Sequence, residues 1–291
     1  MVVIPLGSDT YELAENPLWW ESKNSFLWVD IEQGNIFKYS LLDNTVECII
    51  STPHRIGAFV LNQNDNILLL TEKGILRVKE KDNEYIIDSN YLYYYPLTGE
   101  RFNDAICDRY GRIIAGIKRD DNSNQGRVVI FEKGKRSRVL IENIQISNGM
   151  GFSNDSKIFY HTDSLRKEIF KYDYNIKLGK ISNRRVLYKN TGVGVPDGMT
   201  VDANNNIFTC IWDEGKILKI DPNHGKIIKE YLLPCKCCSS LIFGGCNLEK
   251  ILVTSAKVSI DKASLTADDG KVFIVENISK GRLEYKAKIY D

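Results

Sequence analysis

The chain has 291 residues, of which 43% are hydrophobic and 26% are charged, as is typical of a soluble globular protein. Thirty-nine Lys and Arg residues against thirty-eight Asp and Glu residues leave a net charge of +1, so no global field favours nucleic acid or an anionic membrane. The apolar runs are strand-sized and far shorter than the roughly 20 residues that span a bilayer, and no basic-then-apolar export signal opens the chain. These features predict a cytoplasmic protein with neither a nucleic-acid nor a membrane partner.

A short Gly/Asn/Asp-rich turn followed by an apolar strand recurs six times along the chain. One apolar anchor residue marks each copy: Phe26, Ile67, Ile113, Ile158, Ile207 and Ile251. Neighbouring anchors are 41 to 49 residues apart. A second apolar strand follows each anchor, at residues 36–39, 75–78, 128–131, 169–172, 217–220 and 272–275. Each unit is therefore predicted to be built on a β-hairpin, with no helical periodicity.

Self-similarity with a period of roughly 40–50 residues, in units of short strands and turns, is typical of a β-propeller. Six periods use nearly the whole chain, so we predict an all-β, six-bladed β-propeller that forms a single domain over residues 1–291. The opening segment VVIPL at 2–6 is expected to complete the blade formed by the last strands, because ring closure protects strand edges that would otherwise pair with other chains.

Cysteine and histidine chemistry is poorly supported. Seven cysteines are an odd number, and without an export signal they are expected to be reduced thiols. Zinc binding by Cys235, Cys237, Cys238 and Cys246 is the alternative, but neighbouring strand residues point to opposite faces, whereas a zinc site needs about four convergent ligands. With three histidines in the chain and no standard hydrolase motif, a Ser-His-Asp or zinc-histidine mechanism is hard to build, and His161 is expected in the core or the channel wall.

Oxygen-bearing side chains fall in phase with the repeat. If equivalent positions in successive blades begin the innermost strands, their side chains converge at one mouth of the central channel. The positions ten or eleven residues before the anchors are Glu15, Ile56, Asn103, Asn148, Asp197 and Ser240. Carboxylate and amide oxygens suit calcium, magnesium or manganese. The alternative is that Asn and Asp before Gly, as in SNGM and PDGM, are ordinary turn formers.

Several long segments resemble the gluconolactonase and regucalcin family, also called senescence marker protein, in order and over almost the full length. They are AENPLWW, RFNDAICDRYGRIIAGI, ISNGMGFSNDSKIFYHTDS, ISNRRVLYK, VPDGMTVDANNNIF and LIFGGCNLEKILVTSA. The chain departs from the family pattern at Ala105, where many relatives have Gly after RFND, and in a C-terminal segment that follows the family's Gly-rich ending only loosely.

The resemblance implies a six-bladed propeller with one divalent metal ion in the central channel. Matching motif to motif, the metal ligands would be Glu15 in AENP, Asn148 in SNGM and Asp197 in PDGM. The substrate contacts would be Arg101 and Asn103 of RFND, together with an acidic residue on the following loop, for which we choose Asp121 over the adjacent aspartate.

The predicted function is hydrolysis of sugar-type lactones by a metal-dependent enzyme whose partner is a small-molecule lactone. The ion, which is calcium, zinc, manganese or magnesium, would polarise the carbonyl or lower the pKa of bound water. Asp197 would act as general base, and Arg101 offers a rigid donor fork for ring oxygens or the developing oxyanion. Two alternatives are a calcium-binding regulatory propeller with little turnover and a related hydrolase of a luciferin-type compound. The residues carry no signal for an oligomeric state.

Overall fold

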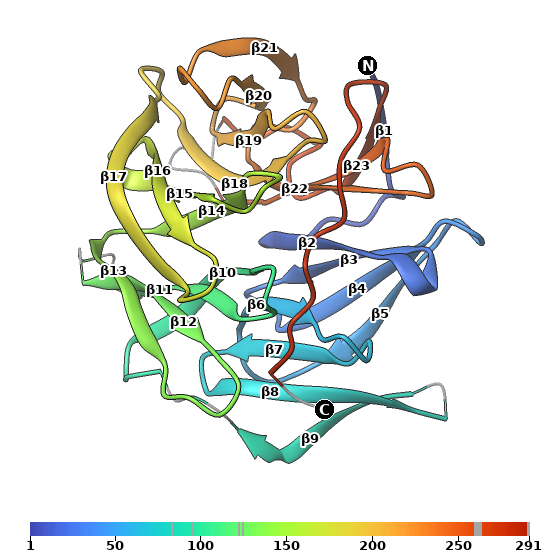
Figure 1. The fold of residues 1–291 in the computed structure, drawn as a ribbon. Helices are drawn as coiled ribbons and strands as arrows, with labels where there is room; N and C mark the ends of the chain where they lie inside the picture. Colours follow the sequence, from blue (N-terminus) through green and yellow to red (C-terminus); the bar gives the residue numbers. More distant parts are fainter. Residues whose placement is uncertain are drawn as a thin grey trace.

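The computed structural model describes residues 1–82, 84–92, 94, 96–121, 123, 125–258 and 264–289. This part of the chain forms six four-stranded antiparallel sheets around a central channel (Figure 1). The strands of blades 1 to 3, four to a blade, are β2 (Ala14–Trp20), β3 (Ser25–Asp30), β4 (Asn35–Ser40), β5 (Thr45–Ser51), β6 (Ile56–Leu61), β7 (Ile67–Thr71), β8 (Gly74–Lys81), β9 (Glu84–Leu92), β10 (Glu100–Cys107), β11 (Ile113–Arg119), β12 (Gly126–Phe131) and β13 (Arg138–Ile144). The strands of blades 4 to 6 are β14 (Ser147–Phe152), β15 (Ile158–Asp163), β16 (Glu168–Asn175), β17 (Lys180–Lys189), β18 (Val195–Val201), β19 (Ile207–Trp212), β20 (Lys216–Ile220), β21 (Ile227–Leu232), β22 (Cys238–Gly244), β23 (Lys250–Ser255), β24 (Phe273–Glu276) and β1 (Val2–Pro5). The predicted six-bladed propeller is confirmed.

Two 3-10 helices, η1 (Glu21–Lys23) and η2 (Ser164–Arg166), are single turns between strands. No helix in the described residues is both long enough and apolar enough to cross a bilayer.

Turn residues explain the regular spacing of the blades. The anchor of each repeat lies in the second strand of its blade, and the following apolar segment lies in the third. Two residues before the anchor, five blades place a residue with positive φ: Asn24, Asp65, Gly111, Ser156 and Asn205, with φ between +46° and +79°. Gly, Asn and Asp tolerate this left-handed conformation better than other residues, so the turn chemistry sets where each hairpin reverses.

The ring closes through the N-terminal strand. β1 pairs antiparallel with β24, with Val3 opposite Val275, and so becomes the outermost strand of blade 6. The prediction that residues 2–6 complete the last blade is therefore confirmed for Val2–Pro5. Joining the two ends of the chain in one sheet lets that sheet reach four strands, like the other five.

Apolar side chains from neighbouring blades form the core. Phe152 of β14 and Phe159 of β15 pack in one cluster with Ile106 of blade 3, and all three are buried. Trp20 of β2 packs in the same way against residues of blade 2 such as Phe59. Each blade therefore packs against its neighbours through both faces of its sheet, which is why the strands are short, nearly continuous apolar runs in the sequence.

The segment that follows the last strand, residues 277–289, is called here the C-terminal strap. In Figure 1 it crosses the propeller from the side of β1 and β23 toward β8. Backbone hydrogen bonds hold it to turns or strand ends of its own blade and of three others: Gly281 N to Leu248 O, Ala203 N to Lys280 O, Ala287 N to Leu61 O, and Lys288 N to Gly111 O. Because β6 and its equivalents finish at this end, the strap covers the end of the channel where the innermost strands stop.

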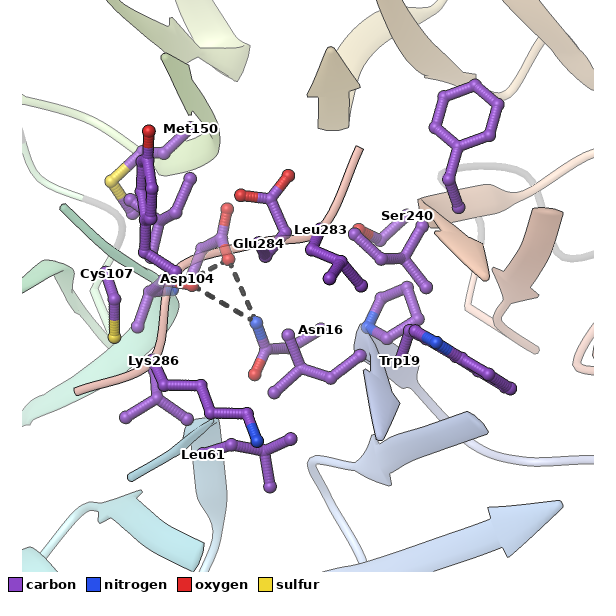
Figure 2. Close-up of a pocket in the computed structure, with 18 of the residues that line it drawn as sticks. Asn16, Trp19, Leu61, Asp104, Cys107, Met150, Ser240, Leu283, Glu284 and Lys286 are labelled. Carbon is purple, nitrogen blue, oxygen red and sulfur yellow. Dashed lines mark hydrogen bonds between the residues drawn. The ribbon is translucent and has the colours of Figure 1, made fainter. Parts of the chain in front are cut away.

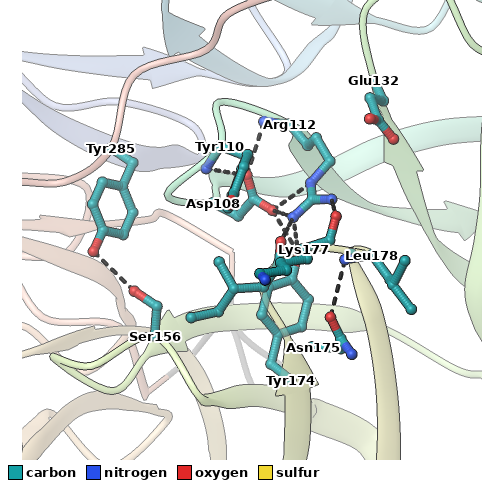
Figure 3. A network of polar contacts seen from close by, with 12 residues as sticks. Asp108, Tyr110, Arg112, Glu132, Ser156, Tyr174, Asn175, Lys177, Leu178 and Tyr285 are labelled. Carbon is teal, nitrogen blue, oxygen red and sulfur yellow. Dashed lines mark hydrogen bonds and ion pairs between the residues drawn. The ribbon is translucent and has the colours of Figure 1, made fainter.

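A buried ionic network ties blade 3 to blade 4 (Figure 3). Asp108 accepts hydrogen bonds from Arg112 Nε and from the Tyr174 hydroxyl, both at 2.6 Å. Arg112 also donates to the backbone carbonyls of Ile176 and Lys177. The side chains of Asp108 and Arg112 are 1% and 3% exposed, so this ion pair is shielded from solvent.

Candidate functional site

The ring positions predicted from the repeat share one backbone irregularity. In every blade the pairing of the innermost strand with the second strand shifts register at this position. The shifts lie between Glu15 and Leu18, Ile56 and Ala58, Phe102 and Asp104, Asn148 and Met150, Pro196 and Met199, and Cys238 and Leu241. A bulge bends its strand and re-aims the side chains next to it. Six bulges at equivalent positions thus form a ring at the end of the channel where the innermost strands begin.

Asn148 and Asp197 lie within strands, so the alternative that they are turn formers is wrong. The glycines after them serve close packing between blades. A Cβ on Gly149 would lie 2.3 Å from the backbone oxygen of Asp197, and one on Gly198 would lie 2.1 Å from Ser240 Oγ. Neither glycine has a positive φ. SNGM and PDGM therefore require Gly because the innermost strands of blades 4, 5 and 6 touch there.

The structure brings three predicted residues into one chain of hydrogen bonds. Arg101 Nη1 donates to Asn103 Oδ1 at 2.8 Å, and Asn103 Nδ2 donates to Asn148 Oδ1 at 2.6 Å. Asn148 Nδ2 in turn donates to Ser164 Oγ at 2.9 Å, and Ser164 donates to the carbonyl of Pro196. All these side chains are buried. The chain fixes the amide of Asn148 and links the RFND, SNGM and PDGM motifs across blades 3, 4 and 5.

Three carboxyl groups lie near one another in the channel. Burial, followed by the neighbouring charge of Asp104, raises the pKa of Glu15 to about 8. Burial also raises the pKa of Asp104 to about 7. Burial, then the charges of Glu15 and Asp104, raise the pKa of Asp197 well above its usual range. These groups repel one another in a desolvated space, and such a site is stabilised by a cation.

The donor set fits a divalent ion that prefers oxygen ligands. Asp197 is 4% exposed, and its buried Oδ1 atom has no hydrogen-bond partner among the described residues. Glu15 is 6% exposed, and in the same part of the chain only the backbone N–H of Asn16 donates to its carboxylate. Across the described residues no three His, Cys, Asp or Glu side chains gather as a metal site, so the carboxylates alone do not make a full set of ligands, and the amide oxygen of Asn148 is the further donor that the sequence analysis predicts. An orphaned carboxylate oxygen beside a second carboxylate and an amide suits calcium, magnesium or manganese.

Asp104 is a site residue that the sequence analysis did not single out as one. It accepts hydrogen bonds from its neighbour Ala105 N at 2.7 Å and from Asn16 Nδ2 at 3.4 Å. The side-chain oxygen of Asn16 accepts from Phe59 N, and its φ of +44° turns the strand at this point. The available signal was position, because Asp104 directly follows the ring position Asn103.

The structure does not bring Asp121 to the other predicted residues. Its side chain is 56% exposed and pairs with Arg119 at 3.2 Å. The adjacent Asp120 instead receives two hydrogen bonds of 3.1 Å from the guanidinium of Arg55, and it lies within electrostatic range of Arg101. Of the two aspartates on this loop, Asp120 therefore lies closer to the channel mouth.

Thiol and imidazole groups take structural positions. Cys235, Cys237 and Cys238 are buried free thiols, and Cys246 is an exposed one. His161 is buried, its Nε2 lies 2.9 Å from Ser147 Oγ, and burial lowers its pKa to about 3. A neutral histidine in the wall of blade 4 agrees with the expectation for His161.

The channel continues beneath the ring as a cavity of about 90 Å³ (Figure 2). Asn16, Asp104 and Ser240 line it together with strap residues 283–286. Most of the remaining wall is apolar, with Met150 among the lining residues. The strap therefore lies across the end of the channel opposite the one at which the innermost strands begin.

Comparison with known proteins yields a family and two close groups of relatives. Residues 13–257 match the family model of the SMP-30/Gluconolactonase/LRE-like region. The chain is 29% identical to regucalcin of Gallus gallus over 272 residues, which cover 90% of this chain and 89% of the relative. It is 26% identical over 300 residues to pentonolactonase XacC of Haloferax volcanii, with 99% of both chains covered.

A solved structure has the same fold. It is the calcium-binding protein regucalcin of Agrobacterium tumefaciens, with a TM-score of 0.90 and 22% identity over 99% of this chain and 97% of the other. At this level of identity the likeness concerns the arrangement of the blades.

Proposed function

The chain belongs to the SMP-30/Gluconolactonase/LRE-like family, and we propose that it is a divalent-metal-dependent hydrolase of sugar-type lactones. The lactonase relative of Haloferax volcanii supports lactone hydrolysis as the activity. The observation that carries the metal dependence is the buried, unpartnered Oδ1 of Asp197 among carboxyls whose pKa values are raised. Such a group has a stable ionised form only beside a cation.

Glu15, Asn148 and Asp197 would hold the ion. When bound, it would supply Lewis acidity toward a carbonyl or a water. The oxygen-only donor set favours calcium, magnesium or manganese over zinc. Asn148 is prepared for this role because its amide is oriented from both sides, by Asn103 and by Ser164.

Arg101 and Asn103 would orient the lactone. Arg101 uses only Nη1 in hydrogen bonds, to Asn103 Oδ1 and to the carbonyl of Phe102. Its Nε and Nη2 make no hydrogen bond to the described residues, so they can donate to oxygens of the substrate. Asn103 holds the guanidinium in place and connects it to Asn148.

Asp197 would act as the general base. Its free Oδ1 can accept a proton from a water as the water oxygen bonds to the lactone carbonyl carbon. The bond from that carbon to the ring oxygen then breaks, and the proton passes to the ring oxygen, which gives the open-chain hydroxy acid. No other group in the ring combines a carboxylate, full burial and an unpartnered oxygen within the described residues.

The test is acid release from gluconolactone, with and without EDTA. Wild type is expected to hydrolyse the lactone with metal and to lose activity on chelation. Asp197→Ala should abolish hydrolysis and weaken metal binding, whereas Asp9→Ala, an exposed control, should do neither. Full, EDTA-sensitive activity in Asp197→Ala would exclude the proposed role of this residue.

The regucalcin relatives favour a second candidate, a calcium-binding regulatory propeller with little turnover. Calcium binding with background hydrolysis across a panel of lactones would support it over the enzyme. Turnover that depends on metal and on Asp197 would exclude it.

A further inference from the structure

Two cations lie side by side next to the candidate site. Arg101 of β10 and Lys118 of β11 are directly opposed in the antiparallel ladder. Side chains of opposed residues project from the same face of a sheet, and like charges in such positions destabilise it. A bound anion would offset the repulsion between two such cations, so an opposed pair of this kind indicates an anion-binding position.

Among the residues that the structure describes, the guanidinium of Arg101 has no anionic group in direct contact. The residue is 4% exposed, and both of its hydrogen bonds, from Nη1, go to neutral oxygens of Asn103 and Phe102. Burial lowers the pKa of Arg101, but a guanidinium stays charged at any physiological pH. Half of the donor fork therefore remains available beside the channel mouth.

Lys118 is similarly placed. It is partly buried and has no hydrogen bond or ion pair with the residues that the structure describes. Burial, and then the charge of Arg101, lower its pKa to about 8, so the ammonium form still predominates at pH 7. The result is a second cation that points to the same space as Arg101.

The nearby carboxylates leave the pair largely uncompensated. Asp120 is engaged by both Nη atoms of Arg55, and Glu72 accepts from Arg55 Nε at 2.9 Å. Glu32 is exposed, and it acts on Arg101 and Lys118 through charge rather than contact. Glu15 also acts on Arg101 through charge, but it is a proposed metal ligand, so Glu32 is the acid left to compete with an anionic ligand.

We propose that Arg101 and Lys118 form an oxyanion subsite, so that the preferred substrates are sugar-type lactones carrying a carboxylate or phosphate group away from the lactone carbonyl. This inference rests on the lactone hydrolysis proposed above. Arg101 supplies a planar fork that matches an oxyanion, and Lys118 supplies a mobile point charge. Asn103 joins the subsite to the proposed metal ligand Asn148, so an anion held here orients the lactone toward the ring.

The first test is binding without turnover. Open-chain 6-phosphogluconate, glucarate and gluconate are titrated calorimetrically into the protein in excess calcium. The first carries a phosphate group and the second a further carboxylate, so the affinity for each anionic group is compared separately with that for gluconate. At least one of the two compounds that carry a second anionic group, each called a dianion below for its two anionic groups, should bind about tenfold more tightly than gluconate, as expected for a charge-assisted contact. Lys118→Met should remove most of this preference, and Lys118→Arg should restore it. Glu32→Gln should increase it.

Lys73→Met is the matched control, because Lys73 is an exposed lysine in the turn between β7 and β8. It should leave the preference for the dianion unchanged. Equal affinities of wild type for all three compounds would overturn the subsite, as would a preference that Lys118→Met leaves intact.

The second test separates this inference from the proposed function. The ratio of kcat/KM for 6-phosphogluconolactone to that for gluconolactone should fall about tenfold in Lys118→Met and stay constant in Lys73→Met. If no lactone is hydrolysed but dianion binding still depends on Lys118, the subsite stands and the hydrolase function fails. If gluconolactone is hydrolysed and the ratio of the two kcat/KM values is the same in both variants, the hydrolase function stands and the subsite fails.

Discussion

Replacing Glu15 by Gln should stabilise the metal-free protein at alkaline pH, although it removes a proposed metal ligand. The pKa of Glu15 is about 8 in the folded protein against the ordinary value of 4.5. Because the folded state holds this proton more tightly than the unfolded chain, the contribution is fully favourable below pH 4.5 and is lost as the pH rises toward 8. At roughly 1.4 kcal/mol per pH unit, the loss reaches about 4 kcal/mol near pH 8.

That magnitude is an upper bound, because water and small movements of the carboxylates relieve part of the repulsion. We expect Glu15→Gln to raise the free energy of unfolding by about 2–4 kcal/mol at pH 8 and by less than about 1 kcal/mol at pH 5. The assay is urea unfolding in EDTA at the two pH values. Excess calcium should then stabilise wild type by mass action and Glu15→Gln much less.

Equal stability of wild type and Glu15→Gln at pH 8 in EDTA would refute the reasoning. It would mean that the folded state does not disfavour the ionised form of Glu15. A second contrary result would be an equal gain in stability from calcium. Glu12→Gln is the control, because Glu12 is an exposed carboxylate close in sequence and should show neither effect.

Three further changes probe the packing and the charges around the site. Gly149→Ala should lower kcat/KM about 100-fold and cost about 1–3 kcal/mol of stability, because its Cβ would meet the Asp197 carbonyl at 2.3 Å; kinetics and thermal unfolding measure both. Asp108→Asn should lower the free energy of unfolding, measured in urea, by about 3–5 kcal/mol, because it leaves the buried charge of Arg112 without its partner. The metal affinity of the folded protein should stay unchanged. Asp121→Asn should leave kcat/KM within about twofold, because the carboxylate is exposed; a tenfold loss would show that this loop contacts substrate.

Much of the architecture could be predicted from local chemistry. The anchors at Phe26 and Ile67, for example, follow turn residues at positive φ, Asn24 and Asp65, and this local rule repeats around the ring. Turn preferences and apolar strands depend on residues that are neighbours in the chain, so they can be predicted from the sequence. The same phase predicts that Asn148 lies at a common level of the channel with its equivalents in the other blades.

The environment of individual side chains was harder to predict from the sequence. Asn148 and Asp197 resembled turn formers because a glycine follows each, yet each glycine packs against the next blade, Gly149 against Asp197 and Gly198 against Ser240, more than forty residues further along the chain. Asp104 and Lys118 gained their importance from burial and from charges on other strands. Asp121 and its neighbour Asp120 differ only in which way the loop presents them.

The sequence by itself determined the repeat, the number of blades, the closure by residues near the N-terminus and the level at which polar groups gather. Each of these follows from contacts within one hairpin or from the count of hairpins. Only the tertiary structure decided which groups lose solvent, which carboxylates face one another and which cations lack a partner. These properties depend on the bulges and on side chains brought together from blades distant in sequence, because desolvation and Coulomb energies act through space rather than along the chain.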